Sequence, residues 1–181
     1  MIVAACAQPL PPAPKLELTF SHLDPIGLDV GSIEIVENYV PPLRSPNIEH
    51  LMPVPPAQAA RRWAEDRLRA RGTERRAQFV IDTAEVVEAK LPVERGLRGA
   101  VTVDQSERYD ATIGVTLEVR DDRGFRLAFA TAKAVRSETV SENLTLRERD
   151  LLLFKLVENL MADLNRELEQ QVQTHLGSYI R

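Results

Sequence analysis

The stretch Tyr109-Asp-Ala-Thr-Ile-Gly-Val-Thr-Leu-Glu-Val-Arg120 decides the fold, because apolar and polar residues alternate along its whole length. An alternation with a period of two residues predicts a β-strand that buries one face. The turn sequence Asp121-Asp-Arg-Gly124 follows, and Gly124 suits the left-handed position of a three-residue hairpin loop. The sequence therefore predicts a long antiparallel hairpin from about Glu107 to Val140.

The loop length predicts which residues of this hairpin face each other. With three loop residues, Leu117 faces Phe129 and Val119 faces Leu127, which gives one bulky apolar face. The other face then carries small, nearly uncharged side chains, namely Thr112, Gly114, Thr116, Ala130, Ala132 and Ala134. Two interpretations are open: the chain covers this flat face itself, or the face receives a partner or a lipid.

Strands are also predicted at Lys15–Phe20, Ser32–Val40 and Gln78–Glu88, from alternation or from β-branched residues. A helix is predicted from about Pro56 to Gly72, since one stripe of apolar residues recurs at helical spacing: Ala57, Ala60, Trp63, Ala64 and Leu68. Residues 41–56 carry six prolines and are expected to form a loop without helix or sheet. This loop is either functional or a packed connection.

The last helix is predicted to start at a capping box formed by Thr145 and Glu148. Its apolar stripe is broad as far as Leu164 and then narrows to Leu168, Val172 and Leu176, before Gly177. The narrow half either projects as a docking seam or bends around its own domain. The expected fold class is α+β: a mostly antiparallel sheet with a long hairpin, packed by two helices on one face.

Length and charge limit the classes of function. The chain has 181 residues, 44% of them hydrophobic, which suits a single domain at residues 15–181 behind a short tail at residues 1–14. The net charge of −4 gives no electrostatic reason to expect nucleic acid as a partner. No run of about 20 apolar residues is present, so no transmembrane helix is expected.

A search for catalytic motifs finds no phosphate-binding loop, nucleophile elbow or zinc-protease helix. The histidines His22, His50 and His175 lack metal-ligand spacing. The one assembly that loops can bring together is Glu49-His50 with His22 and Asp24, and we interpret these as solvated loop residues in preference to a metal or acid–base site. Three carboxylates on one predicted strand divide between its two faces: Asp82, Glu85 and Glu88. We therefore expect no enzyme, no metal and no cofactor.

The tail contains the only cysteine, in the sequence Val3-Ala-Ala-Cys6-Ala-Gln8. An aliphatic residue and two small residues before a cysteine resemble the bacterial lipobox, where the cysteine receives lipid. Four prolines between Pro9 and Pro14 then predict a semi-extended tether. A complete export signal has a positive region and a longer apolar stretch, whereas five residues precede Cys6 here. A chance cysteine in a tail is the alternative interpretation.

The order of elements behind this motif resembles the auxiliary lipoproteins of bacterial ABC-type lipid-trafficking systems. The stretches that carry the resemblance are Val3–Cys6, Ala60–Trp63 through Leu68–Gly72, and Leu117–Gly124. The resemblance implies a non-catalytic accessory, anchored by lipid at Cys6 and facing the periplasm, that binds a transporter subunit or lipid. The residue after the cysteine, Ala7, resembles an outer-membrane sorting signal. An alternative role is a scaffold or regulator of cell-wall or outer-membrane assembly.

Overall fold

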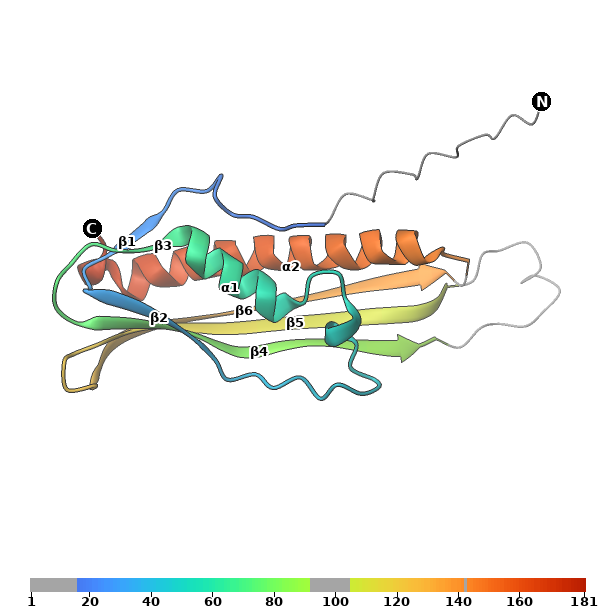
Figure 1. Ribbon diagram of the computed structural model, residues 1–181, viewed down its shortest axis with the longest axis horizontal. Helices are drawn as coiled ribbons and strands as arrows, with labels where there is room; N and C mark the ends of the chain where they lie inside the picture. Colours follow the sequence, from blue (N-terminus) through green and yellow to red (C-terminus); the bar gives the residue numbers. More distant parts are fainter. Residues whose placement is uncertain (1–15, 92–104, 142) are drawn as a thin grey trace, which may run out of the picture.

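Three long strands carry the fold, with a shorter strand at one edge (Figure 1). The computed structural model describes residues 16–91, 105–141 and 143–181. Within them β4 (Arg76–Lys90), β5 (Gln105–Arg120) and β6 (Arg126–Ser141) are antiparallel neighbours. The strand β2 (Ser32–Glu37) adds in parallel to β4, which gives the order β2-β4-β5-β6. The predicted α+β class with a mostly antiparallel sheet and a long hairpin is confirmed.

Both helices lie on one side of this sheet, as Figure 1 shows. The helix α1 (Pro56–Arg67) packs over β4, and α2 (Leu146–His175) lies along β6 and β5. The predicted capping box starts α2, since the Thr145 hydroxyl accepts from the Glu148 amide and the Glu148 carboxylate accepts from the Thr145 amide. A proline at the first position of α1 costs no hydrogen bond, because that amide has no helical partner.

The first helix is shorter than its apolar stripe predicted. It ends at Arg67, and Leu68–Ala70 form the strand β3, which pairs in parallel with β1 (Ile26–Leu28). Gly72 therefore does not end the helix. Its lack of a side chain permits a close approach instead, because a Cβ at Gly72 would lie 2.8 Å from the Asp29 carbonyl carbon.

The register of the β5–β6 hairpin differs by one residue from the prediction over most of its length. Arg120 faces Arg126 as a three-residue loop requires, but a bulge at Leu127, opposite the step from Arg120 to Val119, shifts the pairs from Val119 as far as Glu107. Leu117 therefore faces Ala130 instead of Phe129. A single inserted residue reverses the faces of the strand beyond it, because side chains alternate with a period of two.

The proposed small-residue face is consequently wrong, since its members lie on opposite sides of the sheet. Ala130, Ala132 and Ala134 pair with Leu117, Val115 and Ile113 and are buried on the side where α2 lies. Thr112, Gly114 and Thr116 pair instead with Val135, Lys133 and Thr131, on the side opposite to the helices. The alanines allow α2 to approach β6 closely, so the chain itself covers this half of the predicted surface.

The proposed docking seam on α2 is also wrong. Leu168, Val172 and Leu176 are at most 2% exposed, so no projecting apolar edge exists there. This half of α2 packs beside α1, and the 3-10 helix η2 (Gly177–Tyr179) closes its end. A helix that packs against one neighbouring helix buries a narrow apolar stripe, whereas a helix that packs on a sheet buries a broad one. The alternative interpretation, a helix held against its own domain, is the observed one.

A buried arginine joins the two helices. The Arg67 side chain is 4% exposed and donates through Nη1 to Asn165 Oδ1 at 2.6 Å, through Nη2 to Glu169 Oε1 at 2.7 Å and through Nε to the Asp24 carbonyl oxygen at 2.6 Å. Asn165 Oδ1 also accepts from Trp63 Nε1 at 2.8 Å. One guanidinium thereby fixes α1, α2 and the loop before β1 relative to one another.

The proline-rich segment is a packed connection along the edge of β4. After β2 ends, the Ile48 amide donates to the Val86 carbonyl oxygen and the Glu88 amide donates to the Pro46 carbonyl oxygen. The short 3-10 helix η1 (Glu49–Leu51) follows. Three apolar residues of this segment are buried: Ile48, Met52 and Val54. The segment thus continues the edge that β2 begins.

The observed register predicts opposite effects for two neighbouring substitutions in β6. Ala132→Leu adds a side chain beneath α2 and is expected to lower the free energy of unfolding by about 1–3 kcal/mol, because a packed core resists added volume. Thr131→Leu lies on the exposed side and should change it by less than about 0.5 kcal/mol. Urea unfolding measures both. In the register predicted from a three-residue loop, Thr131→Leu would instead be the more destabilising of the two substitutions.

Candidate functional site

The predicted loop cluster does not assemble into a catalytic or metal site. His22 and Asp24 are exposed in the loop before β1, and His50 is exposed in η1. Among the described residues, no group of three or more His, Cys, Asp or Glu side chains is placed to hold a metal ion. Glu49 differs from its neighbour His50, because it is buried and its side chain is held by two donors.

The strand carboxylates have separate partners. Asp82 accepts a hydrogen bond from the Thr116 hydroxyl at 2.7 Å, and Glu88 pairs with Arg149 of α2 at 3.1 Å. Glu85 faces Thr112 in the register of β4 with β5. Asp82 and Glu85 thus both lie against threonines of β5, because a bulge between Ile81 and Thr83 interrupts the alternation, whereas Glu88 reaches α2.

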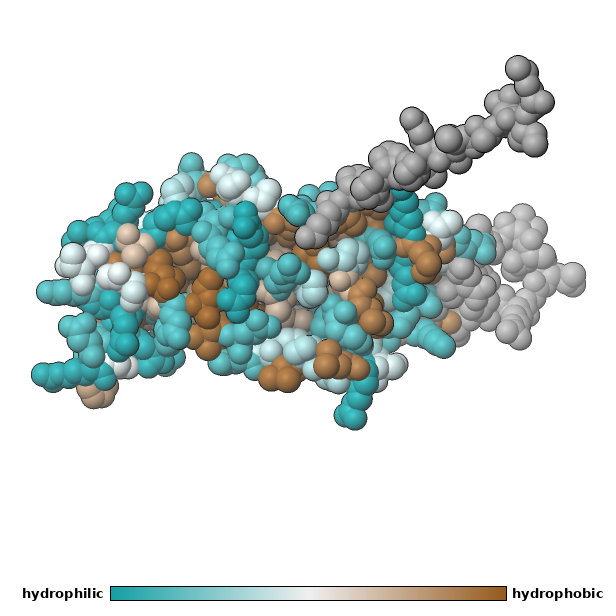
Figure 2. All heavy atoms as spheres, viewed as in Figure 1, coloured by the Kyte–Doolittle hydropathy of each residue, from teal (hydrophilic) through white to brown (hydrophobic). Residues whose placement is uncertain are grey.

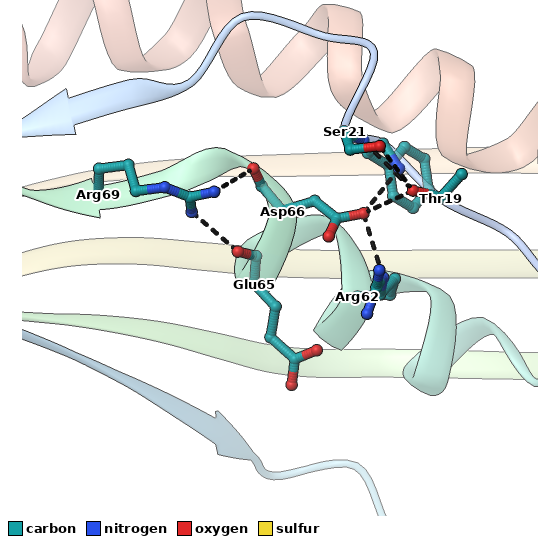
Figure 3. A network of polar contacts seen from close by, with 7 residues as sticks. Thr19, Ser21, Arg62, Glu65, Asp66 and Arg69 are labelled. Carbon is teal, nitrogen blue, oxygen red and sulfur yellow. Dashed lines mark hydrogen bonds and ion pairs between the residues drawn. The ribbon is translucent and has the colours of Figure 1, made fainter.

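The first described residues of the chain are attached to α1 by one carboxylate (Figure 3). Asp66 Oδ2 accepts from the Phe20 amide at 2.8 Å, from the Thr19 hydroxyl at 3.1 Å and from Arg62 Nε at 3.1 Å. Residues 16–20 form no strand, so the strand predicted at Lys15–Phe20 is wrong over its described part. A side-chain acceptor replaces a neighbouring strand as the partner of this backbone.

The electrostatics of this attachment favour the ionised form of Asp66. Burial opposes the charge, but the hydrogen bonds from Phe20 and Thr19 and the positive charge of Arg62 outweigh it, so the pKa of Asp66 lies below its usual range. Phe20 itself is buried in the core. The attachment therefore combines a buried aromatic ring with a charged acceptor at adjacent positions of the chain.

The same end of α1 is closed by Arg69, which Figure 3 also shows. Its guanidinium donates to the carbonyl oxygens of Glu65, Asp66 and Leu68 at 2.8–3.0 Å. These carbonyls lie at the end of the helix, where intrahelical donors run out. A cation there also interacts favourably with the helix dipole. Arg69 is thus a capping residue that lets the chain pass directly from α1 into β3.

A cavity of about 290 Å³ lies between the end of β2, the proline-rich segment and the start of α1. Its apolar lining consists of Pro41, Pro55, Ala57 and Ala84. Glu49 also lines it; Glu49 Oε1 accepts from the Tyr39 hydroxyl at 2.9 Å and Oε2 accepts from the Val86 amide at 3.2 Å. The cavity therefore combines apolar walls with a buried carboxylate.

The charges around Glu49 are predominantly negative. Burial, together with the hydrogen bond to Glu49 and the charges of Glu49 and Glu85, raises the pKa of Tyr39 well above its usual range. Arg61 lines the cavity too, but it pairs with Glu37 at 3.3 Å. The sequence offered Glu49 only through its neighbour His50, and Tyr39 and Arg61 were missed because an irregular segment brings them together.

The outer surface offers no single large apolar area on the side seen in Figure 2, where hydrophobic residues form separate patches among hydrophilic ones. No helix of the described residues is both long and apolar enough to cross a membrane. The predicted lipidation residue Cys6 and its tether at residues 1–14 lie outside the described residues. Along the chain, the attachment of residues 19 and 20 to α1 is therefore the first described contact after the predicted anchor.

Comparison with protein-family models and with curated proteins finds no match to this chain.

The attachment of the N-terminal segment predicts a pH-dependent stability. The depressed pKa of Asp66 means that its contribution is complete above about pH 4, the usual carboxyl value, and is lost as the pH falls through the folded value. Asp66→Asn should therefore lower the free energy of unfolding by about 2 kcal/mol at pH 7, and by less at pH 3.

Urea unfolding at the two pH values measures this difference. Glu65→Gln is the matched control, because Glu65 is an exposed neighbour on the same helix, and it should have an effect below about 0.5 kcal/mol at both pH values. An equal loss for Asp66→Asn at pH 7 and pH 3 would contradict the assignment.

Proposed function

We propose that this protein is a membrane-anchored accessory lipoprotein of the bacterial envelope, facing the periplasm, that binds a transporter subunit or lipid in lipid trafficking. The single observation that carries the proposal is the lipobox-like sequence Val3–Cys6 followed by a proline-rich tether. The proposal includes no covalent chemistry by the protein and places it at the outer membrane.

The way the folded part begins supports an anchored function. A force on the tether would reach the chain at Leu16 and then meet Thr19 and Phe20, whose hydrogen bonds end on Asp66 of α1. Arg67, the next residue, fastens α1 to α2. A load on the N-terminus would thus pass first into the two helices.

The tether length sets how far the domain can stand from a membrane. Ten peptide steps separate Cys6 from Leu16. An extended chain advances at most about 3.5 Å per residue, so the reach is at most about 35 Å. This reach keeps the domain close to the membrane, where it can contact a partner or lipid in the same bilayer. Several acyl chains on one cysteine would hold it there, whereas a single chain binds only marginally.

Acylation is the direct test of the anchor. In the native host, the N-terminal peptide is expected to begin at Cys6 and to carry acyl chains by mass spectrometry, with the protein in the membrane fraction. Cys6→Ser should abolish acylation and release most of the protein from that fraction, since no other described feature attaches it to lipid. Gln8→Ala is the control, because it alters the tether and keeps the cysteine. An intact N-terminus with a free thiol in the cytosol would contradict the proposal.

Photo-crosslinking in cells tests the proposed partner. Thr116 lies on the side of the sheet opposite to the helices, and Gln173 is exposed on α2. A photoreactive side chain at each position therefore samples a different surface. A transporter subunit or lipid as the main adduct supports the proposal. A cell-wall synthase or an outer-membrane assembly protein as the main adduct would favour the scaffold alternative instead.

A further inference from the structure

The cavity beside Glu49 has the features of a binding site for an organic cation. We propose that it binds an alkylammonium group, with the charged nitrogen on the Glu49 carboxylate and the methylene chain against the apolar wall. That wall consists of Pro41, Pro55, Ala57 and Ala84. This inference does not depend on the lipid anchor, because every residue in it belongs to the described domain.

The buried carboxylate of Glu49 has no positively charged partner among the described residues. Glu49 is 3% exposed, and the two groups that donate hydrogen bonds to its carboxylate within the described residues are neutral: the Tyr39 hydroxyl and the Val86 amide. No lysine, arginine or histidine among the described residues forms an ion pair with it. Arg61 and His50 line the same cavity, but Arg61 pairs with Glu37. A buried carboxylate without a cation is unfavourable, and a bound cation removes that cost.

The Glu49 carboxylate has the capacity for further hydrogen bonds. An ionised carboxylate has about four acceptor positions on its two oxygens, and Tyr39 and Val86 occupy one on each. Glu49 also lines the cavity, so a ligand bound there would lie beside this carboxylate. An ammonium group supplies three donors and a full positive charge, which matches this arrangement better than a neutral donor does.

The cavity suits an organic cation better than a metal ion. A metal ion needs several protein ligands, and no set of three acidic, histidine or cysteine side chains among residues 16–91, 105–141 and 143–181 is placed to hold one. The cavity has a volume of about 290 Å³, at the small end of ligand sites. Its apolar wall suits a short methylene chain, which a metal ion lacks.

Glu49 also has a structural role, which the test must separate from binding. Oε2 holds η1 against β4 through the Val86 amide, and Oε1 accepts from the Tyr39 hydroxyl. A neutral glutamine keeps one acceptor oxygen, so it can still accept from the Tyr39 hydroxyl but loses the bond from Val86. The negative charge is therefore not required for attachment to Tyr39. If the affinity of a cationic ligand depends on the negative charge of Glu49, then Glu49 binds the ligand and does not act only as a packing contact.

The experiment is a titration of the full 181-residue chain, labelled with 15N, with n-butylammonium chloride at pH 7 and low salt. Saturable shifts are expected for the amides of Ala57, Ala84 and Val86, and Glu49→Gln should weaken the affinity at least tenfold. 1-Butanol, which has the same alkyl chain without the charge, should give no saturable shift. Sodium chloride at the same concentration controls for ionic strength.

The proposal is overturned if wild type does not saturate, if Glu49→Gln binds equally well, or if 1-butanol gives the same response. Tyr39→Phe provides a second variant should Glu49→Gln unfold: it keeps the carboxylate and removes a competing donor, so its affinity should equal or exceed that of wild type. A tenfold loss in Tyr39→Phe would contradict the role of the carboxylate. Nα-acetyl-lysine methylamide tests where the amine comes from. If it binds more tightly than butylammonium, the ligand is a lysine side chain of a partner protein. If it binds more weakly, the ligand is a free small amine.

Discussion

The hydrogen bonds of one buried guanidinium, that of Arg67, determine how the helices sit on the sheet. This side chain reaches α2 at Asn165 and Glu169 and the loop before β1 at Asp24, and it lies over the Trp63 ring with 5.6 Å to the centroid. A guanidinium with its donors satisfied tolerates burial, whereas removal of its partners leaves an uncompensated charge. Because three separate segments meet at Arg67, α1 and α2 act as a single layer.

That layer explains why the two sides of the sheet differ. Alanines on β6 allow α2 to lie close above it, and Arg136 at the strand pairs with Asp163 on the helix. The helix therefore protects the outer strand, which has a strand neighbour on one side only among the described residues. The opposite side keeps Thr112 and Thr116 half-buried and free of helices. An antiparallel sheet commonly presents such a face to water or to a partner.

Local patterns in the sequence predicted the elements well, and long-range contacts limited what more they could predict. The alternation of residues 109–120, the turn glycine Gly124 with its φ of 88°, and the Thr145–Glu148 capping box all depend on neighbours along the chain, and the structure contains each of them. The register required knowledge of a bulge at Leu127, which no local signal marks. The end of α1 and the burial of Leu168 depend on β1 and α1, which are distant in sequence.

The two candidate sites also differ in whether a local sequence pattern or long-range contacts define them. Cys6 is a motif residue and was predicted from the sequence, whereas the Glu49 cavity arises where β2, the proline-rich segment and α1 converge. The attachment of residues 19 and 20 and the Glu49 cavity both depend on α1 being held in place, since α1 carries Asp66 at one end and lines the cavity at the other. A double-mutant cycle of Arg67→Met and Asn165→Ala, measured by urea unfolding, tests this claim most directly. A coupling of at least about 1.5 kcal/mol is predicted, and effects that add to within about 0.5 kcal/mol would contradict the account.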